Sequence, residues 1–241
     1  MPLTLSIDAI ASAFPRYRVG VVVATDLTIP PERPAELDAL IHQRGEAARA
    51  RWAGTELSSI PGIAAWREAY RAFGIKQTRY RSSVERLVKN VLAGRELPRV
   101  NGFVDLYNAV SLAHVLPLGA DDLDRVAPPF AFRYAREDDT FVDMADAANG
   151  DGETEPSPPK PGEVVFADAE KVLCRRWNWR QDARSLIRPE TTRAIVTVQS
   201  NGAGDVDAAV ADLATLITRF CSGRTASAIA DAANPNVSID L

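Results

Sequence analysis

Side chains that both donate and accept hydrogen bonds gather in the stretch Pro98–Asn108. Asn101 and Asp105 fall on the first turn of an expected helix, and Asp105 and Asn108 are i, i+3 neighbours on one helix face. Helix capping by Asn101 and a favourable dipole position for Asp105 give these two residues a structural explanation. That explanation omits Asn108, because asparagine is a poor residue for a helix interior. The pattern therefore predicts a site that recognises a small polar group.

A second polar cluster occupies Arg175–Asp182. Read as a strand, the cluster places alternate side chains on opposite faces. The two faces are Trp177, Trp179 and Gln181 on one side, and Arg176, Asn178 and Arg180 on the other. One face can enter the core while the other meets an anionic or polar ligand. A fully structural role stays equally open, since tryptophan is more often a core residue than a binding platform.

Other motifs are incomplete. Gly202-x-Gly204-x-x-Asp207 follows a strand and opens a helix, but an acid replaces the third glycine of a dinucleotide turn, so a turn with a helix cap is expected. Asp121-Asp122-Leu123-Asp124 lacks a second ligand group at fixed spacing, which favours a polar turn over a magnesium site. No nucleophile elbow, phosphate loop or H-E-x-x-H motif is present. We expect neither a metal nor a cofactor.

The cysteines and histidines exclude further classes of site. Cys174 and Cys221 form no C-x-x-C pair, and together with only two histidines they leave a zinc site without its usual spacing. Because His42 and His114 both fall on expected helices, a Ser–His or Cys–His catalytic pair has no support. So few cysteines fit a reducing cytoplasm.

Composition and charge are those of an ordinary globular protein. Of the 241 residues, 46% are hydrophobic and 25% charged, and a chain of this length can bury a sizeable core, so we expect one domain over 1–241. A net charge of −4 argues against binding nucleic acid by bulk charge. No basic-then-apolar leader opens the sequence, and the longest apolar run, Val19–Ala24, is too short to span a membrane. We therefore expect a cytoplasmic location and no membrane partner.

Charge is distributed unevenly along the chain. Residues 67–99 carry a net charge of +6 and residues 175–193 carry +4, whereas residues 121–155 carry −8. Basic segments with nearby aromatic residues are what a binder of phosphate backbones needs. Solvated helix faces explain the same segments without any ligand, and this alternative stays open.

Helices are expected mostly in the first half of the chain and strands in the second, which favours an α+β class. The expected helices are Glu36–Trp52, Pro61–Gly74, Ser82–Gly94, Asn101–Val115 and Asp205–Phe220. The expected strands are Leu3–Ile7, Val19–Thr25, Ala131–Tyr134, Thr140–Met144, Val164–Ala167, Lys171–Trp179 and Ala194–Gln199. Residues 147–161, rich in Pro, Gly, Ser and Glu, predict a flexible solvated loop.

Several of these segments, in this order over 79–197, resemble the B3/B4 tRNA-editing domain family of the phenylalanyl-tRNA synthetase β subunit. The matching segments are Arg79–Glu85, then Asn101-x-x-Val104-Asp105-x-x-Asn108, then Leu116-Pro117-Leu118-Gly119-x-Asp121-Asp122-Leu123, then Trp177–Asp182 followed by Glu190-Thr191-Thr192. The resemblance implies a layered β-sandwich of unusual topology with helices packed outside. It also implies a freestanding aminoacyl-tRNA deacylase acting in trans, which hydrolyses an amino acid wrongly esterified to tRNA.

The resemblance also implies roles for individual residues. Asp105 and either Gln181 or Asp182, near the family's editing glutamate, are the expected catalytic residues. The expected substrate-binding residues are Asn101, Asn108, Gly119 and Asn178. Gly119 stands where the synthetase domain carries a histidine. An aminoacyl ester is already activated, so a positioned water and preorganised donors for the oxyanion can suffice for its hydrolysis.

The expected partner is tRNA rather than DNA. The residues expected to contact its phosphates, partly from one exposed face, are Lys76, Arg79, Arg81, Arg86 and Lys89. Two other functions stay open. One is a non-catalytic module of the same fold that binds tRNA or an amino acid, and the other is a small-molecule hydrolase or binder that never meets tRNA.

Overall fold

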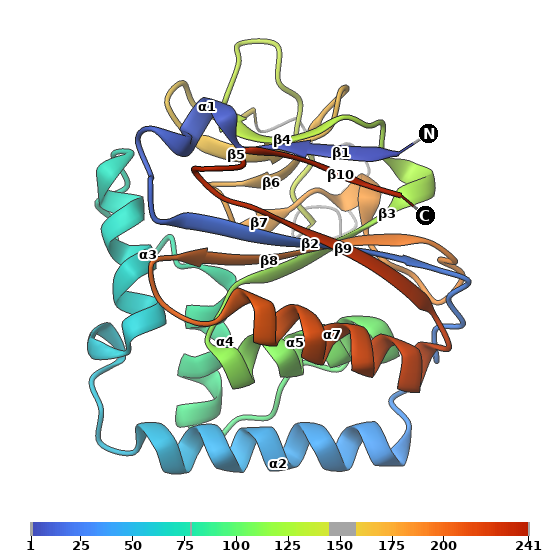
Figure 1. The fold of residues 1–241 in the computed structure, drawn as a ribbon. Helices are drawn as coiled ribbons and strands as arrows, with labels where there is room; N and C mark the ends of the chain where they lie inside the picture. The colour runs from blue at the N-terminus through green and yellow to red at the C-terminus, as the bar shows by residue number, and fades with distance from the viewer. Residues whose placement is uncertain (1, 78, 145–157, 241) are drawn as a thin grey trace.

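The computed structural model describes residues 2–77, 79–144 and 158–240. Within these residues, two β-sheets lie face to face and a layer of helices covers the outer face of one of them (Figure 1). The predicted α+β class and the sandwich with external helices are thus confirmed. Most of the loop expected over 147–161 lies outside the described residues.

The six-stranded sheet forms one outer layer, at the top of Figure 1. In spatial order its strands are β10 (Asn236–Ile239), β1 (Leu3–Ser6), β4 (Phe130–Tyr134), β5 (Val164–Ala167), β6 (Val172–Arg175) and β7 (Arg180–Gln181). Only the pairing of β1 with β4 is parallel among these neighbours. Residues from both ends of the chain therefore share one sheet edge.

The four-stranded sheet is the middle layer and is antiparallel throughout. Its order is β3 (Leu118–Asp122), β8 (Ala194–Asn201), β2 (Tyr17–Thr25) and β9 (Arg224–Ala230). Along β2, Val21 and Val23 belong to the core between the sheets, whereas Val22 belongs to the core under the helices. A strand buried on both faces needs a continuous apolar run, which explains its β-branched sequence.

The longer helices occupy the layer beneath this sheet, with α2 outermost and α3 at the side, whereas the short α1 lies at the top beside β4 (Figure 1). The helices are α1 (Asp8–Ala11), α2 (Ala35–Trp52), α3 (Pro61–Ala72), α4 (Ser83–Leu92), α5 (Gly102–His114) and α7 (Val206–Cys221), with 3-10 turns η1 (Leu57–Ser59), η2 (Leu123–Arg125) and η3 (Ala183–Ser185). The start of α4 is fixed by Ser82, whose Oγ accepts a hydrogen bond from the Glu85 N–H at 3.4 Å. The spacing Ser82-x-x-Glu85 is that of a capping box, but only half of the box forms, because the Glu85 carboxylate binds Arg67 and Arg81.

Three predicted features of the strands differ from the structure. Thr140–Met144 contributes only an isolated bridge, from Asp143 to Asp182, and no strand. The strand predicted over Lys171–Trp179 stops at Arg175, and the predicted alternation of faces from Arg176 to Gln181 is wrong. A turn after Arg175 ends the strand and breaks the alternation, because Arg176 and Trp177 take positive φ angles of 46° and 67°. Strands β3, β9 and β10 were not predicted.

That turn directs Trp177 into the core between the sheets. Its indole is fully buried and lies edge-on to the rings of Phe14, Tyr17 and Trp66, at centroid distances of 4.6, 4.8 and 5.2 Å. Edge-to-face arrangements of this kind add about 0.5–1.5 kcal/mol per pair beyond area burial. The aromatic cluster therefore fixes the point at which β6 turns towards β7.

We predict that Gly20→Ala destabilises the sandwich. A Cβ at Gly20 would lie 2.4 Å from Val210 Cγ2 and 3.1 Å from Val206 Cγ1, so α7 would have to shift on the sheet. Overpacking of this kind costs about 1–3 kcal/mol. Urea unfolding measures the effect. Gly119→Ala is the matched control, since Gly119 is also on a strand and nothing lies within 4 Å of its Cβ position. Equal unfolding midpoints for the two variants would contradict the prediction.

Candidate functional site

A cavity of about 370 Å³ opens between α4, α5 and the strands β3, β7 and β8. Four residues singled out from the sequence line it together: Asn108, Gly119, Asn178 and Gln181. We call this cavity the amide pocket. Its residues come from four separate elements or turns, so the tertiary fold, and no local motif, assembles it.

Asn108 offers an unoccupied amide to the amide pocket. It lies in the middle of α5, and its side chain makes no hydrogen bond to any residue that the structure describes. An asparagine inside a helix with a free carboxamide can donate to one ligand atom and accept from another. The structure thus leaves this helix-interior asparagine without a structural partner in the described residues.

Asn178, by contrast, is a fixed part of the pocket wall. Tyr70 Oη donates to its Oδ1 at 2.9 Å, and its Nδ2 donates to Gln199 Oε1 at 3.2 Å. Gln199 Nε2 in turn donates to Thr197 Oγ1 at 3.1 Å. Burial raises the pKa of Tyr70 well above its ordinary value, so the phenol stays a donor. Thr197 and Gln199 also line the pocket, and sequence analysis missed both.

Gln181 is held on one side and free on the other. Its Nε2 donates to Asp121 Oδ1 at 3.0 Å and to the Ala120 carbonyl oxygen. No hydrogen bond from the described residues reaches its Oε1, which leaves an acceptor for a ligand. These two hydrogen bonds to β3 therefore fix the orientation of the Gln181 side-chain amide.

Asp121 is the acid of the amide pocket, although the sequence predicted a polar turn there. It is 3% exposed, and Ser185 Oγ donates to its Oδ1 at 2.7 Å. Burial raises its pKa to about 7, while the hydrogen bonds from Ser185 and Gln181 act in the opposite direction. The signal that could have found it is its place in a strand, Leu118–Asp122, where it shares a face with Gly119, two residues earlier.

Gly119 leaves room in the amide pocket. A Cβ built at this glycine would meet no heavy atom within 4 Å. A larger side chain at this position would therefore project into open space. In this chain that space stays available to a ligand.

Asn101 and Asp105 lie outside the amide pocket. Asn101 Oδ1 accepts from the Val104 N–H at 3.0 Å, and its Nδ2 donates to the Ile187 carbonyl at 3.3 Å. Asp105 accepts from Arg33 Nε at 2.9 Å and from the Val100 N–H at 2.9 Å. Both residues are buried, at 3% and 1% exposure. The side-chain hydrogen bonds of both residues are therefore used in contacts that cap α5 and hold the neighbouring loops.

Asp182 is likewise engaged elsewhere. It is fully buried and accepts hydrogen bonds from the Val142 N–H at 2.9 Å and the Arg184 N–H at 2.8 Å. The Arg184 guanidinium adds an ion pair at 2.7 Å. The carboxylate therefore caps η3 and does not line the amide pocket. Of the two alternatives near the family's glutamate position, only Gln181 does.

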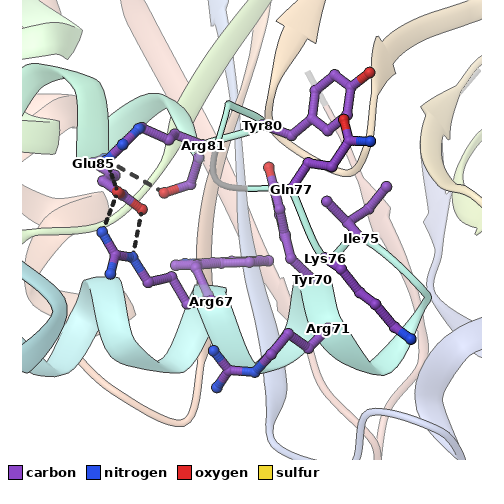
Figure 2. A pocket seen from close by; sticks show the side chains of 11 residues that line it. Arg67, Tyr70, Arg71, Ile75, Lys76, Gln77, Tyr80, Arg81 and Glu85 are labelled. Carbon is purple, nitrogen blue, oxygen red and sulfur yellow. Dashed lines mark hydrogen bonds and ion pairs between the residues drawn. The ribbon is translucent and has the colours of Figure 1, made fainter.

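Three of the five residues predicted to contact RNA line one of two cavities, and Arg79 and Lys89 line neither. Arg86 lines the amide pocket, whereas Lys76 and Arg81 line a second cavity of about 110 Å³ beside α3. Figure 2 shows Arg81 turned towards Glu85, and Lys76 pointing to the other side of the second cavity. Arg79 stacks on the Tyr80 ring at 4.8 Å, and Lys89 is exposed on α4 without lining either cavity.

A stacked wall separates the two cavities. The Arg176 guanidinium lies 3.8 Å from the centroid of the Tyr80 ring and 4.3 Å from that of the Trp179 ring. Tyr80 lines the second cavity and Trp179 lines the amide pocket. The cavities are thus neighbours across one layer of side chains.

The fold and its amide pocket define a mixed α/β domain that presents fixed and free hydrogen-bonding groups to a small polar ligand. A family model, the B3/4 domain, matches residues 65–222, and the chain therefore belongs to the B3/4 domain family. This confirms the family resemblance drawn from the sequence.

Among solved structures, this chain is similar to the N-terminal fragment of the phenylalanyl-tRNA synthetase β-subunit from Pyrococcus horikoshii. The two share 12% identity with a TM-score of 0.47, over 92% of this chain and 50% of that one. This chain thus spans half the length of that fragment. Among curated proteins, none matches at a significant level.

Two further features concern only the described residues. None of their helices combines the length and apolar character needed to cross a membrane. No group of three or more His, Cys, Asp or Glu side chains is placed there to hold a metal ion.

We predict that Asp105→Asn destabilises the protein by about 2–4 kcal/mol. The Arg33 side chain is 2% exposed and would lose its buried carboxylate partner, and breaking one partner of a buried pair is strongly unfavourable. Asp38→Asn is the control, because Asp38 pairs with the same guanidinium from a side chain that is 43% exposed. Urea unfolding should show a smaller loss for Asp38→Asn. A loss at Asp105 no greater than that at Asp38 would refute the structural role.

Asp121→Asn should become more stable relative to the wild type as pH rises from about 4 to about 7. With its pKa raised to about 7, the native carboxyl keeps its proton where the unfolded chain, near its ordinary value of 3.8, has lost it. The native state then binds more protons, so wild-type stability falls with rising pH, whereas asparagine cannot ionise. The gap should grow by at least about 1 kcal/mol, because a tenfold change in proton affinity corresponds to about 1.4 kcal/mol.

Denaturant unfolding at several pH values measures this gap. Asp124→Asn is its control, since Asp124 lies in the same segment with an exposed side chain. A gap that stays constant between pH 4 and 7 for Asp121→Asn would show that its carboxyl titrates normally.

Proposed function

We propose that this protein is an aminoacyl-tRNA deacylase that acts in trans on the ester of a mischarged tRNA. The observation that carries the proposal is the meeting of Asn108, Gln181 and Asp121 in one pocket of a B3/4 domain. The two amides retain free hydrogen-bonding atoms there, among the described residues. Such a pocket suits a reaction that needs positioning more than a strong nucleophile.

In the proposed reaction, a water oxygen attacks the ester carbonyl carbon and the bond from that carbon to the ribose oxygen breaks. The water proton ends on the ribose oxygen, and a free amino acid leaves. Gln181 Oε1 accepts a hydrogen bond from the water or from the α-ammonium group of the substrate. The Asn108 amide donates to the oxygen that gains negative charge, where one preorganised donor contributes about 10²–10³ in rate.

Asp121 is a positioning residue in this scheme. It accepts from Gln181 Nε2, and this bond turns Gln181 Oε1 towards the substrate. Gly119 supplies room for the amino-acid side chain. Of the three residues predicted from the sequence as catalytic, the proposal keeps only Gln181, since the Asp105 and Asp182 carboxylates are held in other contacts.

Binding of tRNA is proposed at the surface around both cavities. Arg86 lines the amide pocket, Lys76 and Arg81 line the second cavity across the Tyr80–Arg176–Trp179 wall, and Arg79 stacks on Tyr80 of that wall. Cationic and aromatic side chains together suit single-stranded RNA ends, whose bases stack and whose phosphates need neutralisation.

A second candidate function is a non-catalytic binding module of the same family. Among the described residues, Asp121 is the only carboxylate that lines the amide pocket, and it lies behind Gln181. Gly119 moreover offers no side chain where the synthetase domain carries a histidine. Both features favour binding without hydrolysis, and assay of hydrolysis separates the two functions.

We predict that the wild type deacylates at least one member of a panel of mischarged tRNAs, and that Gln181→Ala lowers the rate at least about tenfold. Loss of about 1.4 kcal/mol of transition-state stabilisation gives that factor. Release of labelled amino acid measures the rate. Gln43→Ala, at an exposed position of α2 that lines neither cavity, is the matched control and should keep full activity.

Two results would redirect this proposal. Wild-type protein that binds charged tRNA but releases no amino acid would assign the chain to the binding module. Gln181→Ala that keeps full activity while folding normally would remove Gln181 from the reaction and contradict the proposed geometry.

A further inference from the structure

Arg86 is a cation of the amide pocket that the described part of the chain leaves unpaired. It lies one turn into α4, is solvent-exposed and lines the pocket. Nearby arginines on the second cavity behave differently, because Arg67 and Arg81 both bind Glu85, at 2.7 and 2.6 Å (Figure 2). Within the described residues, the Arg86 guanidinium makes no ion pair or hydrogen bond.

A second guanidinium lines the same pocket. Arg180 pairs with Asp143 through Nη1 at 2.9 Å, while its Nε is buried and has no partner among the described residues. Burial, and then the neighbouring charge of Arg180, lower the pKa of Arg86. Two guanidinium groups therefore share a wall of the pocket, where Asp143 pairs with Arg180, and an additional anion there would be stabilised by both.

Ser83 adds a neutral donor to this end of the pocket. It lines the pocket, and its Oγ is buried without a partner among the described residues. Ser83 and Arg86 are i, i+3 neighbours, so α4 presents them on one face. Ser83 is also the first residue of this helix, where the backbone dipole favours negative charge.

The charges of the amide pocket are therefore separated. Arg86 and Arg180 come from α4 and β7, whereas the acid, Asp121, comes from β3. A matching ligand carries a cationic group and an anionic group at different ends. In an aminoacyl ester the carboxyl group is uncharged, so its cation is the α-ammonium and its nearest anion is the phosphate of the esterified nucleotide.

We propose that Arg86, Arg180 and Ser83 form a phosphate subsite of the amide pocket, which binds the 5′-phosphate of the nucleotide whose ribose carries the ester. This inference rests on the proposed function and names the part of the substrate that the pocket recognises besides the amino acid. Arginine suits this role, because its planar fork matches phosphate oxygens two at a time.

Binding of nucleotides without any ester tests the subsite separately from catalysis. Since tRNA ends in adenosine, the probes are adenosine 5′-monophosphate, adenosine and inorganic phosphate, titrated calorimetrically into the full chain. The monophosphate should bind at least about tenfold more tightly than adenosine. Arg86→Ala should abolish this preference, and Arg86→Glu should reverse it.

Arg71→Ala is the matched control. Arg71 is an exposed arginine without a partner in the described residues, but it lines the second cavity, so the preference should persist. Circular dichroism checks that each variant is folded. Arg86→Lys keeps the charge without the fork, and an intermediate preference is expected.

The outcomes distinguish the possible sources of the phosphate. Equal binding of adenosine and its monophosphate by the wild type, or a preference that survives Arg86→Ala, would overturn the subsite. Arg86-dependent binding of inorganic phosphate as tight as that of the monophosphate would identify a free-phosphate site and overturn the nucleotide assignment. An Arg86-dependent preference in a protein without deacylase activity would support the subsite while refuting only the proposed hydrolysis.

Discussion

Burial of Trp177 between the two sheets is the interaction on which the amide pocket depends. Arg176 and Trp177 adopt positive φ angles, a conformation that costs about 1–2 kcal/mol per residue. A fully buried tryptophan surrounded by aromatic rings offsets this, since an aromatic side chain buries about 150–250 Å² at roughly 25 cal/mol per Å². The burial of Trp177 places the next residues, Asn178 to Gln181, in the wall of the amide pocket.

The same turn connects the two cavities. Tyr70 of the second cavity donates to Asn178, and Asn178 donates onward to Gln199 in the amide pocket. Arg176 fills the space between the Tyr80 and Trp179 rings. A chain of fixed donors and acceptors makes one wall rigid, so the groups that remain free on the other sides can be positioned accurately against it.

Charged groups in this protein divide into two populations. Asp105, Asp182 and Glu85 are buried and neutralised by arginines, and the pair of Arg33 with Asp105 holds together segments that lie 72 residues apart in the sequence. Asp121 and Arg86 differ, because each lines the amide pocket without an ion-pair partner in the described residues. Ionisable groups that line a cavity without an ion-pair partner are available to a ligand, and this contrast supports the proposed site more than the number of polar residues does.

Local sequence determined the helix starts and two strands of the central sheet, β2 and β8. Ser82, Asn101 and Asp205 each cap a helix through an N–H three residues onward, a contact that spacing alone specifies. The apolar run of β2 likewise required a strand buried on both faces. The family resemblance and the free amide of Asn108 followed from the same local patterns.

Tertiary structure decided which polar residues meet a ligand. The sequence could not show that Asp105 pairs with Arg33, because the two are 72 residues apart. Nor could it show that Asp121 turns inward to Gln181, 60 residues away, or that a left-handed turn breaks the strand at Arg176. Local periodicity fixes which face a side chain takes on its own element. The partner that occupies its hydrogen bonds comes from distant elements, and only packing of the two sheets and the helices brings these together.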